Sequence, residues 1–199
     1  MGHSQTEKKK NHERIVRTAS KRFREKGLQG VGIADLMKEV GLTVGGFYKH
    51  FDSRDDLVVE ALGSAFETWR RQSTAAVCSG RPLTYAKLVD DYLSETHRDH
   101  LGSSCAISAL AGEIARSGKR TRALLTEEIR KALQLIADLT PSKDEGPARS
   151  EAILTLSALV GAIGLSRAVS DEALSREILK TVGGFLKKEA CRSHSRRTD

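Results

Sequence analysis

The chain has 199 residues, of which 39% are hydrophobic and 30% charged, proportions typical of a soluble globular protein that exclude a disordered one. Its formal net charge is +7, and the first 54 residues carry 12 Lys and Arg against 6 Asp and Glu, so most of the excess lies in the first quarter. A basic segment of this kind is expected of a protein that binds a polyanion, although a merely solvated face has the same composition.

The cysteine and histidine residues are scattered along the chain. The three cysteines are far apart and form no CxxC pair, so the sequence predicts neither a disulfide framework nor a zinc site. His97 and His100 have no third ligand nearby, and we expect them to be surface histidines. The first 13 residues are too polar for a signal peptide, and the most apolar stretch, 152–165, is too short to span a bilayer. These features predict a cytoplasmic protein that needs no metal or cofactor and has no membrane partner.

Long helices are the expected structure, because the chain has only 3 prolines and 5% aromatic residues and no segment alternates apolar and polar residues for long. In the first helix, Ile15, Ala19 and Phe23 form a buried stripe, and Gly27 ends it. After a basic arm over residues 1–10, the patterns predict nine helices, at 11–26, 33–40, 44 to 50 or 51, 54–74, 83–96, 105–116, 119–139, 148–169 and 171–188.

The run at 33–51, IADLMKEVGLTVGGFYKHF, contains two short helices joined by a turn at 41–43. The turn glycine allows the second helix to leave at a steep angle, and Thr43 is expected to cap it. Phe47 and Phe51 lie four apart and should pack inward. The opposite side, turned to solvent, should then carry Val44, Gly45, Tyr48 and Lys49.

Two adjacent glycines, Gly45 and Gly46, stand inside this second short helix. Each costs about 1 kcal/mol relative to alanine in a helix interior. That cost is explained if the helix must approach another surface closely. The major groove of DNA is such a surface, because it admits a helix between its phosphates.

The same run resembles the helix-turn-helix of the TetR (tetracycline-repressor-like) family. The resemblance covers about a quarter of the chain and is carried by Phe23, Gly27, Ile33-Ala34-Asp35-Leu36, Gly41-Leu42-Thr43, Gly45, Phe47-Tyr48-Lys49-His50-Phe51 and Ser53-Arg54-Asp55-Asp56-Leu57. The chain departs from the family pattern at Gly32, where a Ser or Thr cap is usual, and at Val44, where a polar residue is frequent.

The resemblance implies an all-α fold, with an N-terminal three-helix helix-turn-helix domain that binds DNA and a C-terminal helical bundle for ligand binding and dimerisation. It also implies that the DNA contacts are Thr43, Val44, Gly45, Tyr48, Lys49, His50 and Arg54, with Val44 and Gly45 facing bases. Two alternatives stay open: His50 could bond a backbone group instead, and Tyr48 could be a packing residue. The lysines and arginines at 8–17 could be a solvated arm or could touch DNA.

We expect a DNA-binding domain at 1–52, a ligand-binding and dimerisation domain at 53–188 and a disordered tail at 189–199. A cavity for a small-molecule effector is expected among residues most of which ordinary core packing explains better: Phe66, Trp69, Tyr92, His97, Cys105, Leu110, Ile129 and Leu133. By the resemblance, the last two long helices, 148–169 and 171–188, pair with those of a second copy in a four-helix interface.

The functional expectation is a repressor that binds a palindromic operator in double-stranded DNA as a homodimer and is released by its effector. The sequence contains no catalytic Ser/His/Asp, metal or phosphate-loop pattern, so an enzyme is not expected. A protein-binding adaptor with the same fold is an alternative, and the basic first quarter argues against it. A transcription activator is a further alternative.

Overall fold

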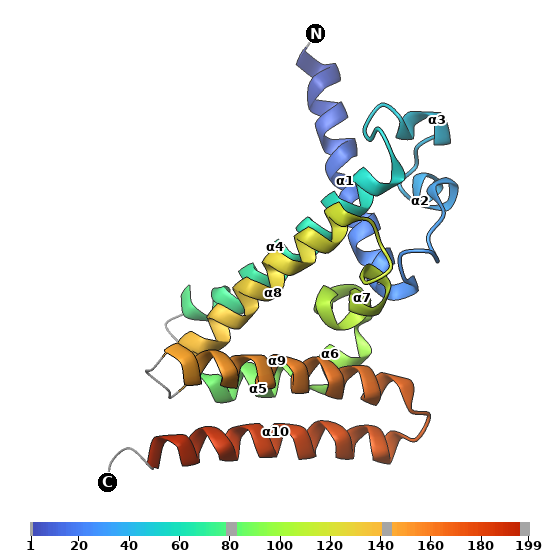
Figure 1. The fold of residues 1–199 in the computed structure, drawn as a ribbon. Helices are drawn as coiled ribbons and strands as arrows, with labels where there is room; N and C mark the ends of the chain where they lie inside the picture. The colour runs from blue at the N-terminus through green and yellow to red at the C-terminus, as the bar shows by residue number, and fades with distance from the viewer. Residues whose placement is uncertain (1, 79–82, 141–144, 196–199) are drawn as a thin grey trace. The chain divides into compact units, whose positions relative to one another are not determined.

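A computed structural model describes residues 2–78, 83–140 and 145–195. Within these residues the regular elements are all helical, which confirms the predicted all-α class (Figure 1). The elements are α1 (Gly2–Lys26), α2 (Ile33–Glu39), α3 (Val44–Phe47), α4 (Arg54–Cys78), α5 (Tyr85–Tyr92), α6 (Glu95–Asp99), the 3-10 helix η1 (Leu101–Ser103), α7 (Ala106–Ile114), α8 (Lys119–Leu139), α9 (Glu145–Ala168) and α10 (Glu172–Ser195).

The chain forms two compact units, each assembled from two stretches of sequence. Unit 1 comprises Met1–Trp69 and Leu101–Leu125, and unit 2 comprises Arg70–His100 and Thr126–Asp199. This division differs from the domain boundary expected at residue 52. The long helices α4 and α8 each contribute residues to both units, so no linker separates them.

Several of the predicted helix limits are wrong. The expected arm over residues 1–10 is helical from Gly2 onward, as the first part of α1. The helix expected at 83–96 is two helices, because the Ser94 side chain caps α6 by accepting a hydrogen bond from the His97 amide at 3.1 Å. The tail expected from residue 189 continues α10 as far as Ser195, and residues 196–199 lie outside the described residues.

Unit 2 is built on α9 and α10, which lie side by side, with α5 packed on α10 and α6 on α9 (Figure 1). The buried side chains of Val89, Leu159 and Ile163 belong to its core. The Tyr85 and Thr155 hydroxyls are 2.8 Å apart within this core, so the polar end of the buried tyrosine is satisfied.

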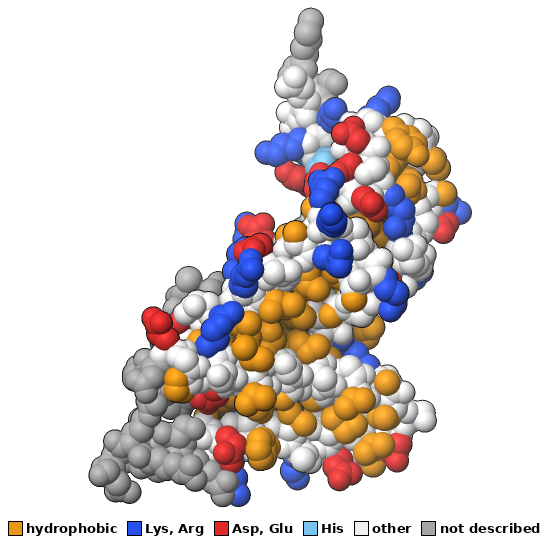
Figure 2. Space-filling view, viewed as in Figure 1, with side chains coloured by type: hydrophobic (Ala, Val, Ile, Leu, Met, Phe, Trp, Pro, Cys, Tyr) orange, Lys and Arg blue, Asp and Glu red, His pale blue; other side chains and the backbone are white. Residues whose placement is uncertain are grey.

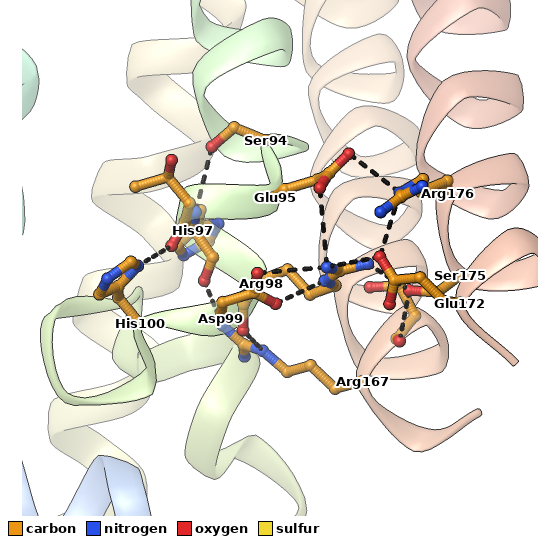
Figure 3. Close-up of polar contacts among 12 residues, drawn as sticks. Ser94, Glu95, His97, Arg98, Asp99, His100, Arg167, Glu172, Ser175 and Arg176 are labelled. Carbon is orange, nitrogen blue, oxygen red and sulfur yellow. Dashed lines mark hydrogen bonds and ion pairs between the residues drawn. The ribbon is translucent and has the colours of Figure 1, made fainter. Parts of the chain in front are cut away.

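Arg98 on α6 ties that helix to α10, although its side chain is buried (Figure 3). Its guanidinium donates to the Ser175 hydroxyl at 2.8 Å and to the Glu172 carboxylate at 3.0 Å. The Asp99 carboxylate accepts from it as well, at 2.6 Å. Arg167 on α9 donates to the main-chain carbonyl oxygen of Arg98 at 2.9 Å, so three helices are joined by charge-assisted hydrogen bonds.

His97 is buried, so the expectation of a surface histidine is wrong for this residue, whereas His100 is exposed. The His97 Nδ1–H group donates to the Tyr92 carbonyl oxygen at 2.6 Å, and the two rings meet edge to face. Burial lowers the pKa of His97 to about 4, since a charged imidazole loses hydration there. In the described part of the chain, no group of three His, Cys, Asp or Glu side chains is placed to hold a metal ion.

Within the described ranges, α9 is long and apolar enough to cross a membrane, judged by length and composition only. The helix extends over 24 residues, beyond the apolar stretch 152–165 that the sequence analysis considered. A third of its most apolar window is buried inside the protein, and an apolar core helix meets the same criterion.

Candidate nucleic-acid interface

The short helix α3 is held in place by an apolar core shared with α1 and α2. Ile15 and Phe23 of α1, Met37 of α2 and Phe47 of α3 are each at most 1% exposed, and Phe51 is 3% exposed. The Phe47 and Phe51 rings stack with their centroids 5.3 Å apart. This arrangement confirms the predicted inward packing of Phe47 and Phe51 and of the α1 stripe. Burial of these large side chains fixes which side of α3 faces solvent.

The turn between α2 and α3 depends on Gly41, whose φ of +69° is a left-handed conformation that glycine adopts without strain. Gly41 donates to the Lys38 carbonyl and Leu42 to the Met37 carbonyl, at 3.0 and 2.8 Å, so the end of α2 is satisfied. Gly27 has a φ of +78° just after α1, which confirms the predicted helix end there.

Thr43 occupies the N-cap position of α3 with an extended backbone, as expected, but its side chain makes no capping hydrogen bond. Its carbonyl oxygen accepts from the Gly46 amide at 2.9 Å. The Thr43 side chain is exposed, so its hydroxyl is available to an external partner.

The outer side of α3 confirms the predicted exposure. Val44 is 49% exposed and Tyr48 67% exposed, and Gly45 and Lys49 are exposed as well. A Cβ added to Gly45 would meet nothing within 4 Å, so nothing within the protein requires a glycine at this position. The helix itself ends earlier than predicted, at Phe47, and tight turns follow.

His50 lies half-buried behind α3, beside α1. Its Nδ1 atom is buried and makes no hydrogen bond within the described residues, so the expected bond to a backbone group is absent at that atom. Burial is the main cause that lowers the pKa of His50, and the charges of His12, Lys8 and Lys49 act in the same direction. The lowered pKa favours the neutral imidazole, and a contact between His50 and a DNA phosphate stays a prediction.

Arg54 has a different environment from the one the resemblance implies. Its guanidinium donates to the carbonyl oxygens of Leu28 and Val31 and lies 5.9 Å above the Phe23 ring. The side chain thereby supports the loop that leads from α1 into α2. A contact between Arg54 and a DNA phosphate stays a prediction.

An ion pair and a hydrogen bond that the sequence analysis missed join α1 to α2 and to α4. Arg22 of α1 donates to both carboxylate oxygens of Glu39 on α2, at 2.8 to 3.0 Å, and this pairing lowers the pKa of Glu39. His12 of α1 contacts Glu60 of α4 at 2.7 Å and stacks on Phe51. Charge patterns along single helices cannot predict such pairs, because the partners are 17 and 48 residues apart.

The eight expected effector contacts are divided between the two units. Phe66, Cys105 and Leu110 are buried in unit 1, and Tyr92, His97 and Leu133 are buried in unit 2. Trp69 and Ile129 are partly buried. The cavity described in unit 1 is lined by other residues, so an effector site formed by these eight stays a prediction.

Two short helices joined by a glycine turn, with a buried inner side and an exposed outer side, define a helix-turn-helix protein. Comparison with known proteins supports the assignment of a helix-turn-helix. Residues 15–61 match the model of the tetR family of bacterial regulatory proteins. This match covers the helix-turn-helix and about a quarter of the chain, so this segment is of the tetR type.

A curated relative, the HTH-type transcriptional regulator SAR2658 of Staphylococcus aureus (strain MRSA252), is 30% identical over 95 residues. The match covers 46% of this chain and 50% of that protein, so the two correspond over about half their lengths.

Solved structures of similar fold include TetR-family regulators from Cytophaga hutchinsonii and Chloroflexus aurantiacus J-10-FL. Both superpose with a TM-score of 0.75 over 92% of this chain and 96% of theirs, at 18% and 22% identity respectively. Similarity at these identities extends the fold assignment beyond the N-terminal segment to most of the chain.

Proposed function

We propose that this chain is a cytoplasmic transcriptional repressor that binds a palindromic operator as a homodimer and is released by a small-molecule effector. The observation that carries the proposal is the outer side of α3, where Gly45, Tyr48 and Lys49 are exposed over a fully buried Phe47. Such a helix fits the major groove, with its glycine at the point of closest approach.

The side chains around α3 suit a nucleic-acid backbone. Tyr48 and Thr43 offer exposed hydroxyls to phosphate oxygens, and Lys49 adds a positive charge. Val44 cannot hydrogen-bond a base edge, so at its position it would contact a thymine methyl group. Figure 2 shows further Lys and Arg side chains on the face of unit 1 turned to the viewer.

Dimerisation is supported by an apolar surface on α9 and α10 (Figure 2). Leu154 and Leu165 on α9 are 70% and 60% exposed, and Leu174 and Phe185 on α10 are 42% and 63% exposed. Each pair is 11 residues apart, which places its members on one side of a helix after three turns. Exposed apolar side chains aligned in this way on two adjacent helices favour a protein partner, and a second copy would form a four-helix interface.

The DNA contact is tested with the double variant Tyr48→Ala/Lys49→Ala in a gel-shift assay on DNA from upstream of the protein's own gene, at two salt concentrations. We expect binding to weaken at least 10-fold while the thermal unfolding temperature stays unchanged, because both side chains are exposed. The control is Lys180→Ala, on the exposed surface of α10. Binding equal to wild type in the double variant would contradict the assignment and favour the adaptor alternative.

Effector release is tested on the same complex. Candidate small molecules are added to the protein bound to its operator, and a repressor is expected to dissociate. Transcription from the operator separates the roles: a repressor lowers it when bound, and an activator raises it.

A further inference from the structure

The first turn of α8 has no side-chain cap. The Arg122 amide donates to the Gly118 carbonyl at 3.2 Å, so Gly118 is the residue that precedes the helix. A glycine has no side chain to accept from the next amide groups, and the first turn contains no acidic residue. The free amides at 119–121 and the helix dipole therefore leave a local positive potential.

This helix end adjoins a cavity of about 280 Å³ within unit 1. Its walls come from the loop at 28–29, the first turns of α4, the end of α7 and residues 117–121. The cavity is large enough for a small organic molecule. None of its lining residues belongs to the outer side of α3 or to the eight residues expected to contact an effector.

Thr121 is the observation that points to a ligand. Its side chain lines the cavity and the residue is only 4% exposed. Its hydroxyl makes no hydrogen bond within the described part of the chain, whereas the neighbouring Ser117 hydroxyl donates to the Glu113 carbonyl at 3.2 Å. The hydroxyl of this largely buried residue is not itself among the fully buried atoms that lack a partner, so it is accessible from the cavity and a bound group would be its acceptor.

The cavity lining contains two arginines and two carboxylates, and of the arginines Arg116 is the one available to an anion. Arg116 is exposed and forms no ion pair in the described ranges, so its guanidinium is available. Arg54 also lines the cavity, but its guanidinium donates to the carbonyl oxygens of Leu28 and Val31. Of the two carboxylates in the lining, that of Glu113 already accepts from the Leu28 amide at 2.7 Å, and that of Asp55 lies on an exposed residue.

We propose that this cavity binds a small molecule through a phosphate or carboxylate group, held by the uncapped amides of α8, the Thr121 hydroxyl and the Arg116 guanidinium. These are donors of the kind that oxyanions accept from in proteins. Arg54 and Glu113 also hold the loop at 28–31 that leads into α2, so an occupant would contact the supports of the helix-turn-helix. An effect on operator binding through this loop rests on the proposed function, whereas anion binding does not.

The site is tested without DNA, by thermal unfolding of the full chain in phosphate, acetate and chloride at matched ionic strength and pH 7.5. We expect phosphate or acetate to raise the unfolding temperature saturably over chloride. Direct titration with phosphate by calorimetry then gives the affinity. Thr121→Val and Arg116→Gln should each weaken it at least 5-fold, whereas Lys180→Gln, a matched loss of charge on α10, should leave it unchanged.

Gly118→Asp tests the same site without removing a buried group. A Cβ at this position would meet nothing within 4 Å, so the side chain can be accommodated. The new carboxylate should cap α8 and occupy the anion position, raising the unfolding temperature while abolishing the response to phosphate. The proposal is overturned if phosphate and acetate act like chloride, or if the Gly118→Asp variant responds as wild type does. A loss of operator binding alone would concern only the proposed function.

Discussion

The Glu113 carboxylate accepts a hydrogen bond from the backbone amide of Leu28, with a distance of 2.7 Å between Oε2 and N. The carbonyl oxygen of the same Leu28 accepts from the Arg54 guanidinium. Both polar backbone groups of one loop residue are thus satisfied by side chains from other helices, α7 and α4. In the loop between α1 and α2, these two side chains supply the hydrogen bonds that backbone groups supply within a helix.

Glu113→Ala should therefore destabilise the protein by about 1–3 kcal/mol, because the Leu28 amide loses its partner in a partly buried position. Glu113→Gln keeps an uncharged acceptor and should lose less. Urea denaturation measures both, with Glu177→Gln on the exposed surface of α10 as the control. Equal stability of the Ala variant and wild type would show that the hydrogen bond contributes nothing.

Gly45→Ala separates folding from DNA binding. Because an added Cβ meets nothing within 4 Å and alanine favours a helix, the variant should be as stable as wild type or more stable, by up to about 1 kcal/mol. If α3 enters the major groove with Gly45 toward the bases, the same methyl group should weaken operator binding several-fold. Denaturation and gel shift on one preparation give both values. Gly63→Ala in α4, where an added Cβ is also unobstructed, is the control.

The first helices were predictable because their apolar positions recur at helical spacing. Ile15, Ala19 and Phe23 form the buried stripe as expected, and the glycines at 27 and 41 stand where φ is positive. These are local properties that spacing and residue type determine. Residue spacing and type also predicted which residues of α3 face outward.

Contacts between distant parts of the chain could not be read from spacing. The resemblance placed Arg54 at DNA, and spacing could not show that its side chain also supports the loop at 28–31. Arg98 and Arg167 have a surface-like sequence pattern, but they form a partly buried network joining α6, α9 and α10. Which carbonyl or carboxylate meets a long arginine side chain depends on the tertiary fold.

The basic stripe of α1 should add affinity that depends on salt. Lys10, Arg14 and Arg17 are exposed and spaced by four and three residues, so they share one side of a helix that extends to Gly2. If they contact phosphates, each change to Gln should reduce the slope of log affinity against log salt by about 1 without altering sequence preference. If the slope is unchanged in the triple variant, these three side chains face solvent and do not contact phosphates.

The apolar surface of α9 and α10 should control the oligomeric state. Leu165→Glu and Phe185→Glu each place a charge on this surface, and we expect the double variant to sediment as a monomer where wild type sediments as a dimer. Both residues are exposed in the single chain, so the helical circular dichroism signal should persist. Lys180→Glu is the control for added negative charge. A double variant that stays dimeric would place the interface elsewhere.

His97 should make stability depend on pH in acid. Its pKa is about 4 in the folded chain, below the ordinary value of 6.5, because the ring is buried and the Arg167 charge lies nearby. As pH falls from 6.5 toward 4, the unfolded chain takes up a proton that the folded chain refuses, so the free energy of unfolding decreases. At most about 3 kcal/mol is lost over this window. Above pH 6.5 His97 is neutral in both the folded and the unfolded chain, so its full contribution to the free energy of unfolding is present there.

His97→Gln removes the titration and keeps a side-chain donor for the Tyr92 carbonyl. Urea denaturation at pH 7.5, 6 and 5 should show a smaller loss of stability in the variant than in wild type, even if the variant is less stable at pH 7.5. His100→Gln is the matched control, because that ring is exposed. The two curves would run parallel if His97 were protonated equally in the folded and unfolded chains, and the low pKa would then be wrong.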